Sequence, residues 1–236
     1  MKAEILFPEV ANLYGDLQNI EYLRRSCASL TVKETSLKEK PGFLTEETAL
    51  VYMGSITERG QELARDALLP YREEIRQKTE AGQLFLLTGN AMDVFGEEIV
   101  SDGGAARKML GLLPLRARYT MMKRYNALFL GKFGETDIVG FKSLFGFTEG
   151  SVPPLFRTVR GCGRSPETPE EGVRVHRFFA THLTGPLLLL NPPFTKYLLR
   201  EMGESEPHLA FEAEAEELYR RRVQEFSDPA TGVEYH

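Results

Sequence analysis

The chain has 236 residues, and its 42% hydrophobic and 27% charged content is close to ordinary globular usage, which argues against a wholly disordered, collagenous or coiled-coil protein. Its 29 basic and 34 acidic residues give a net charge of −5 without a basic block, so a nucleic-acid binder is disfavoured. Two cysteines cannot form a disulfide framework and suit a reducing cytosol. We expect neither a metal nor a cofactor.

Targeting signals are absent from the sequence pattern. Residues 1–7 lack the apolar core of a signal peptide. The longest apolar run, residues 186–190, is far shorter than the ~20 residues that a membrane span needs. We therefore expect a cytoplasmic protein without a membrane span.

The first half alternates short apolar runs with helical patterns. Strands are predicted at residues 5–7, 30–32, 49–53 and 83–87. Asp16 is predicted to cap a first helix, and Thr57 a long helix that ends at Gly82. This alternation predicts βαβ units and an α/β fold with a mostly parallel sheet covered by helices.

The second half is β-rich and interrupted by glycines. Strands are predicted at residues 137–141, 155–159 and 173–181, with a loop at 161–172 and a short helix starting at Pro192 or Pro193. A C-terminal amphipathic helix is predicted within residues 206–228, with an apolar stripe of Phe211, Ala215, Leu218, Tyr219, Val223 and Phe226. No linker is long enough to separate two domains, so one domain over residues 1–236 is expected.

Chemistry in an open parallel sheet is expected where strands end at their carboxyl termini. The turn Thr88-Gly89-Asn90 follows a buried strand and has the small residues of a nucleophile elbow, which lifts one side chain above the sheet. Gly89, at its tip, has no side chain to present. We predict that the elbow persists as backbone, because glycine accepts a positive φ without cost.

Four motifs in order resemble one known family. They are Asn12-Leu13-Tyr14-Gly15-Asp16-x-x-Asn19, then Gly54 followed after six residues by Gln61-Glu62-Leu63-Ala64, then Asp137-Ile138-Val139-Gly140-Phe141, and last Thr181-x-Leu183-x-Gly185-Pro186-Leu187-Leu188-x-x-Asn191-Pro192. Over roughly residues 5 to 200 the chain is similar to the amidotransferase subunits of lipid II isoglutaminyl synthase, which are related to class I glutamine amidotransferases of the cobyric acid synthase type. The resemblance implies their fold, which is the flavodoxin-like α/β fold of class I glutamine amidotransferases. Members hydrolyse glutamine with a Cys–His pair and pass ammonia to a Mur-ligase-like partner that amidates a peptidoglycan precursor.

The departures from the family fall on the catalytic positions. Where the family's elbow reads Cys-Gly-Gly-Tyr-Gln, this chain reads Gly89-Asn90-Ala91-Met92-Asp93. The family's Thr-Tyr-Leu-His-Gly-Pro becomes Thr181-His182-Leu183-Thr184-Gly185-Pro186, and Gly-Gly-Gly-Gln-Asp becomes Gly54-Ser55-Ile56-Thr57-Glu58. The nucleophile position is therefore Gly89 and the base position Thr184. Neither residue can supply its part of thioester chemistry.

The resemblance with these departures predicts a degenerate subunit, a pseudoenzyme that binds or regulates a Mur-ligase-like enzyme in cell-wall precursor amidation. One alternative is an active amidotransferase or hydrolase with a relocated nucleophile such as Cys162, which lies in a glycine-rich loop between two arginines that would lower its pKa. His182, two residues before the base position, is a surrogate base candidate.

A further alternative is a small-molecule binding module in the former glutamine cleft. The expected ligand is a small anion or a glutamine-like molecule, held by Gly54, Ser55, Asn90 and Thr184. The N–H groups of Asn90 and of Gly54 or Ser55 would serve as donors. The competing expectation is that Met92 and His182 fill the cleft.

Overall fold

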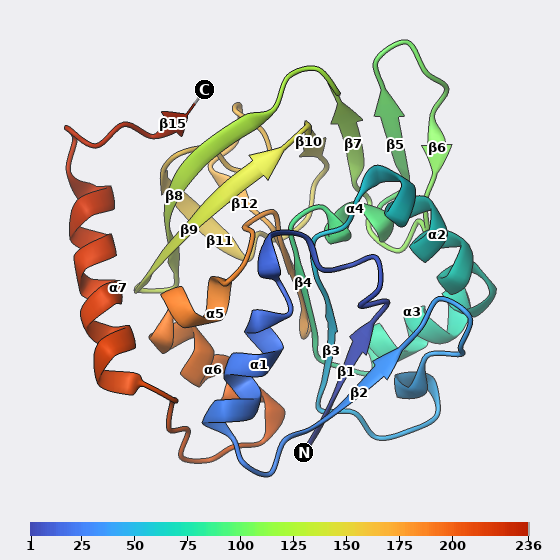
Figure 1. The fold of residues 1–236 in the computed structure, drawn as a ribbon. Helices are drawn as coiled ribbons and strands as arrows, with labels where there is room; N and C mark the ends of the chain where they lie inside the picture. Colours follow the sequence, from blue (N-terminus) through green and yellow to red (C-terminus); the bar gives the residue numbers. More distant parts are fainter. Residues whose placement is uncertain (236) are drawn as a thin grey trace.

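The computed structural model describes residues 1–235 and places three sheets among them. The largest has the strand order β13-β14-β4-β3-β1-β2 (Figure 1). Its strands are β1 (Lys2–Leu6), β2 (Thr31–Thr35), β3 (Leu50–Met53), β4 (Phe85–Thr88), β13 (Val173–Val175) and β14 (Phe178–Thr181). Neighbours pair in parallel except β13 and β14, which confirms the predicted parallel-rich α/β sheet.

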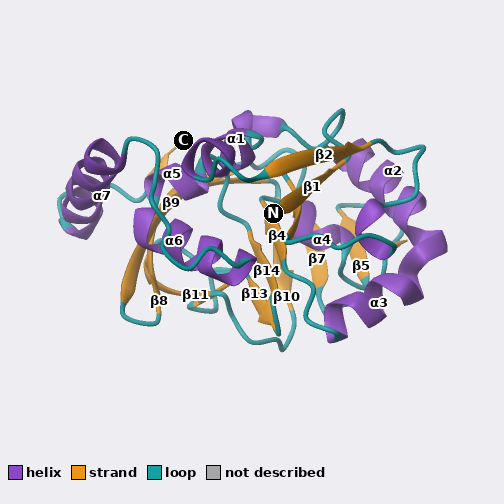
Figure 2. Ribbon diagram, turned by 90° about the horizontal axis from the view of Figure 1, so that it is seen from below, coloured by secondary structure: helices purple, strands orange, loops and turns teal. Residues whose placement is uncertain are grey.

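Two apolar layers cover this sheet because successive side chains of a strand point to opposite faces. Leu50 and Tyr52 belong to the core that includes α1 (Gln18–Ser26), α5 (Leu187–Leu190) and α6 (Pro192–Met202). Val51 and Met53 belong to the core that includes α2 (Glu58–Leu68), α3 (Arg72–Glu80) and α4 (Ala91–Val94). Figure 2 shows the two groups of helices on either side of the strands.

The second half adds two further sheets, as its β-rich pattern predicts. One has the order β10-β7-β5-β6, with β5 (Glu98–Ser101), β6 (Arg107–Lys108), β7 (Arg116–Tyr119) and β10 (Gly146–Glu149). The other has the order β12-β11-β8-β15, with β9 also paired to β8; it contains β8 (Tyr125–Phe133), β9 (Thr136–Leu144), β11 (Phe156–Arg160), β12 (Glu170–Glu171) and β15 (Glu234–Tyr235). The last helix, α7 (Glu212–Ser227), lies at the edge opposite α2 and α3 (Figure 1).

Two helix predictions are wrong in detail. The helix predicted from Thr57 to Gly82 is broken by a 3₁₀ turn, η3 (Leu69–Tyr71), because Pro70 has no N–H to continue the helical ladder. The Thr57 cap itself is confirmed: its hydroxyl accepts from the Gly60 N–H at 3.0 Å. Asp16 is not a cap, since α1 begins at Gln18 and the Asp16 side chain is buried elsewhere.

Two predictions for the second half also need correction. The strand predicted at 173–181 is the antiparallel hairpin β13–β14, which turns at His176 with a φ of 53°. The stripe predicted for the last helix is only partly buried: Ala215 and Phe226 are covered, but Phe211 and Leu218 are 62% and 51% exposed. No helix of residues 1–235 has both the length and the apolar character to cross a membrane.

Candidate functional site

The elbow after β4 is present, as predicted. Gly89 has a φ of +60°, and Asn90 leads into the short helix α4. A Cβ atom on Gly89 would lie 2.0 Å from Ser55 Oγ and 2.8 Å from Ser55 Cβ. The serine side chain therefore occupies the space that a nucleophile's side chain would need.

Ser55 stands at the end of β3 and is 1% exposed. Its Oγ has no hydrogen-bond partner within residues 1–235. Its N–H donates to Asp16 Oδ2 at 2.6 Å. The Ser55 N–H is thus not free to bind an anion, which removes one of the donors expected from the sequence.

Asp16 ties together the loops that follow four strands. Besides the Ser55 N–H, its carboxylate accepts from Thr88 Oγ1 at 2.8 Å and from the N–H of Gly185. Burial raises the pKa of Asp16, while these donors act in the opposite direction. The motif residues Asp16 and Gly185 thus hold the site's backbone in shape.

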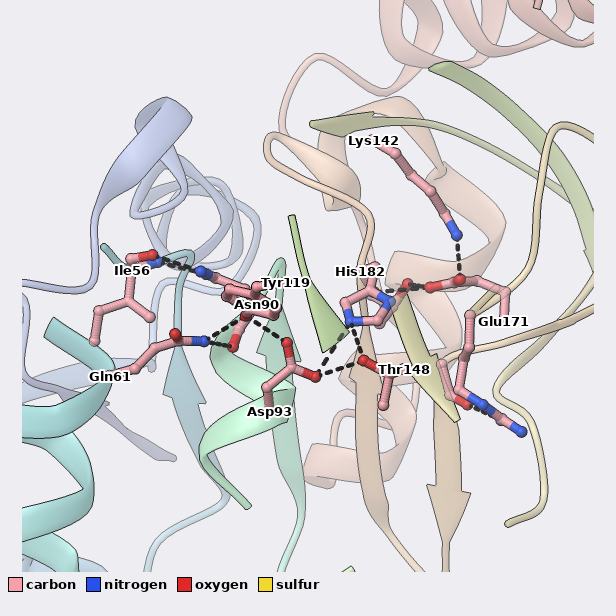
Figure 3. A network of polar contacts seen from close by, with 12 residues as sticks. Ile56, Gln61, Asn90, Asp93, Tyr119, Lys142, Thr148, Glu171 and His182 are labelled. Carbon is pink, nitrogen blue, oxygen red and sulfur yellow. Dashed lines mark hydrogen bonds and ion pairs between the residues drawn. The ribbon is translucent and has the colours of Figure 1, made fainter. Parts of the chain in front are cut away.

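Asn90 is fixed by its neighbours (Figure 3). Its Nδ2 donates to Ile56 O at 2.7 Å, and its Oδ1 accepts from the Ile56 N–H at 3.0 Å. Gln61 Nε2 donates to Asn90 O and to Tyr119 Oη, each at 2.8 Å. The amide of Asn90 therefore joins the elbow to the loop after β3 and is not available to a ligand.

His182 pairs with Asp93 on the other side of the cleft (Figure 3). The Nε2 atom of His182 lies 3.4 Å from Asp93 Oδ1 and 3.3 Å from Thr148 Oγ1. Asp93 also accepts from Thr148 Oγ1 at 2.8 Å and from Tyr119 Oη at 2.7 Å. Because the Thr148 proton is given to Asp93, Nε2 faces two acceptors, and we infer that it carries the ring proton. Nδ1 has no partner within residues 1–235.

A buried ion pair supports the strand that carries His182. Glu171 accepts from the His182 N–H at 2.7 Å and from Thr181 Oγ1 at 2.8 Å, and it pairs with Lys142 (Figure 3). Burial alone would raise the pKa of Glu171, but the Lys142 ammonium holds it below its usual value. Lys142 also donates to Cys162 O at 2.8 Å, so the pair fixes the 161–172 loop.

These elements enclose a cleft of about 330 Å³. Three of the four expected binding residues line it, namely Ser55, Asn90 and Thr184, whereas Gly54 does not. Thr184 is tied to Phe141 O through both its N–H, at 2.9 Å, and its Oγ1, at 3.2 Å. His182 forms part of the wall, but Met92 is buried in the core beneath, so the two side chains do not together fill the cleft.

Cys162 differs from its sequence-based description. It is 9% exposed and does not line the cleft. Burial raises the pKa of its thiol, the opposite of the expected direction, and Sγ donates to Gly163 O at 3.3 Å. The flanking glycines allow a close backbone approach, since a Cβ on Gly161 would lie 2.5 Å from Leu128 O and one on Gly163 would lie 2.2 Å from Thr168 O. The thiol has the setting of an inert buried cysteine.

The sequence reasoning missed two features of this site. Asp93 was not singled out, although Asp93 and His182 both depart from the family motifs and lie in contact. The position of Ser55 over Gly89 was missed as well. In each of these two contacts, Gly89–Ser55 and Asp93–His182, both residues depart from the family's motifs. Such paired departures were the sequence signal that could have indicated the contacts. Among residues 1–235 no group of three or more His, Cys, Asp or Glu side chains is placed to hold a metal ion.

Comparison with known proteins gives one curated relative and several solved folds. No family model matches the chain. It is 28% identical over 199 residues to the lipid II isoglutaminyl synthase (glutamine-hydrolyzing) subunit GatD of Staphylococcus aureus (strain N315), which covers 82% of this chain and 80% of GatD. A glutamine amidotransferase crystal structure matches 85% of this chain and 99% of its own, with a TM-score of 0.56 and 16% identity. PurLQS from Thermotoga maritima matches 85% of this chain and 96% of its own, with a TM-score of 0.54 and 14% identity.

The parallel-rich sheet, the retained elbow and the order of the four motifs agree with these similarities. The chain therefore has the fold of glutamine amidotransferases and is similar in sequence to the GatD subunit of lipid II isoglutaminyl synthase.

Proposed function

We propose that this chain is a GatD-like subunit that has lost glutamine hydrolysis and that binds or regulates a Mur-ligase-like enzyme in cell-wall precursor amidation. The observation that carries the proposal is the elbow, where Gly89 offers no nucleophile and Ser55 takes the nucleophile's space. Thr184 stands at the base position, and its hydroxyl is already donated to Phe141 O. Losing one member of a catalytic unit of this kind costs several orders of magnitude in rate.

Ammonia release from glutamine tests the loss of activity. We expect the purified chain to release none above the buffer blank, alone or mixed with the Mur-ligase-like protein of the same organism. The glutamine-hydrolyzing GatD subunit serves as the positive control. Turnover that Cys162→Ser abolishes would contradict the proposal and support the relocated nucleophile.

A variant that restores the family's residues tests whether the elbow can still present a nucleophile. Gly89→Cys, Ser55→Gly and Thr184→His together place the family's residues at all three positions and remove the clash at the elbow. We expect the new thiol to react with a small electrophile faster than Cys162 does, because Cys162 is buried. Gly89→Cys alone is expected to fold less well.

We also propose that the cleft retains weak affinity for a small anion or a glutamine-like ligand. The Ser55 N–H is already donated to Asp16 and is not available to such a ligand. The proposed affinity is supported by the positive charge of Arg124 and by the open volume of the cleft, which Arg124 and Thr184 both line. Calorimetric titration with glutamine, glutamate and phosphate is the test. No heat from any of the three would leave the chain as an interaction partner alone.

A further inference from the structure

A second groove opens beside the cleft, on the loop that joins β7 to β8 at the top of Figure 1. It has a volume of about 230 Å³. We call it the basic groove and define it by Arg118, Lys123, Arg124, Tyr125, Phe145 and Phe147. The lining carries three cations and no acidic residue, although the chain as a whole has a net charge of −5.

The cations of the basic groove are hardly neutralised. Arg118 lies 3.9 Å from Glu149, and both side chains are mostly exposed, so this pair is weak. Lys123 and Arg124 form no ion pair within residues 1–235. By contrast, Arg116 on the same strand as Arg118 lies 2.9 Å from Glu97. The positive charge is therefore left on the groove side.

Aromatic rings hold this charge in place. The Arg124 guanidinium lies over the Phe145 ring at 4.4 Å, and its Nη1 donates to Tyr14 Oη at 3.3 Å. Tyr125 and Phe147 meet edge to face with their centroids 5.4 Å apart. The Arg124 side chain is exposed but restrained by these contacts, which limits the side-chain entropy that a bound partner would remove.

The neighbouring loop exposes apolar side chains. Met122 is 95% exposed and Met121 is 38% exposed. Methionine, arginine and tyrosine are enriched in protein interfaces, and lysine is depleted. An apolar tip beside unneutralised cations matches a protein surface better than it matches a nucleic acid, whose approach the overall negative charge also opposes.

We propose that the basic groove docks an acidic segment of a partner protein, with carboxylates against Arg118 and Lys123 and an apolar side chain against Met122. This rests on the partner role proposed above. Arg124, Phe145 and Gly146 line both the basic groove and the cleft, so the docked segment would lie at the cleft mouth. Docking there would couple partner binding to access to the cleft.

Fluorescence anisotropy with a labelled peptide of alternating glutamate and leucine tests the proposal on the full chain. We expect binding that weakens as salt rises, because exposed charges are screened. Arg118→Glu with Lys123→Glu should weaken it by roughly tenfold, since two exposed pairs are lost and replaced by repulsion. The matched control is Lys38→Glu with Arg157→Glu, two exposed cations outside the groove, which should leave binding unchanged.

Several results would overturn the assignment. They are no binding of the peptide by the wild-type chain, equal loss with the control variant, or equal binding of a peptide in which glutamine replaces glutamate. Tighter binding of a single-stranded oligonucleotide or of inorganic phosphate at the same residues would assign the groove to another ligand.

Titration of the Mur-ligase-like protein separates this proposal from the proposed function. A complex that forms equally well with the groove variant, together with no peptide binding, rejects the groove and keeps the partner. Peptide binding that depends on Arg118 and Lys123, without a complex, keeps the groove and rejects that partner.

Discussion

Gly89→Ala tests whether Ser55 occupies the space that a side chain at the tip of the elbow would need. The added Cβ would stand 2.0 Å from Ser55 Oγ at a φ of +60°. A left-handed conformation costs a non-glycine residue about 1–2 kcal/mol. Overpacking a buried site costs about 1–3 kcal/mol more. We therefore expect the variant to lose about 2–5 kcal/mol of unfolding free energy.

Gly134→Ala is the matched control for this measurement. Gly134 has a φ of +58°, and an added Cβ there would meet nothing within 4 Å. It should therefore show the conformational cost of about 1–2 kcal/mol without the clash. Urea unfolding of both variants, followed by circular dichroism, gives the difference that the Ser55 contact accounts for.

Ser55→Gly completes a double-mutant cycle with Gly89→Ala. Because the clash needs both side chains, the pair should recover roughly 1–3 kcal/mol relative to the sum of the single changes. If Gly89→Ala costs no more than Gly134→Ala, or if Ser55→Gly gives no recovery, then the serine does not block the elbow and the reasoning fails.

Three further predictions concern a buried ion pair, a helix cap and two buried tyrosines. Glu171→Gln should lower the free energy of unfolding by about 3–5 kcal/mol, because it leaves the fully buried Lys142 charge uncompensated. Adding Lys142→Met should restore part of that loss. Thermal and urea unfolding measure both effects. Thr57→Ala should cost about 1 kcal/mol by removing the cap of α2, and Thr57→Ser should be near neutral in the same assay. Burial raises the pKa of Tyr22 and Tyr219 to about 12, so their contribution to stability should be complete below their unfolded pKa near 10 and disappear as the pH rises through about 12. Ultraviolet titration of phenolate absorbance beside circular dichroism checks this, and ionisation of all tyrosines near pH 10 in the folded chain would contradict it.

The parallel sheet could be predicted because its strands are buried on both faces. Residues 49–53 and 83–87 are continuous apolar runs, and the observed strands β3 and β4 lie within a residue or two of them. Asp16 shows the limit of such reasoning. An aspartate before a helical pattern suits a cap. The Asp16 carboxylate instead accepts hydrogen bonds from three segments that are distant in the chain, and no local sequence pattern reveals these donors.

The candidate site likewise has a part that local sequence predicts and a part that depends on contacts between distant segments. The elbow could be predicted from its own few residues, since an apolar strand, a glycine and small residues are adjacent in the chain. The contact between Gly89 and Ser55, and that between Asp93 and His182, each join segments far apart in the sequence. Such contacts depend on the packing of the folded chain, so a single sequence shows only that each position departs from the motif.

The elbow keeps its shape with glycine at its tip because the restraints on the turn come from other residues. Asp16 holds the loops after β1, β3, β4 and β14, and the amide of Asn90 clamps the turn to Ile56. A nucleophile at this position would have to adopt the left-handed φ, a strain that active sites retain for function. Gly89 adopts the same φ without that cost of about 1–2 kcal/mol. Glycine at the tip therefore avoids this strain, while the restraints from Asp16 and Asn90 keep the turn in its shape.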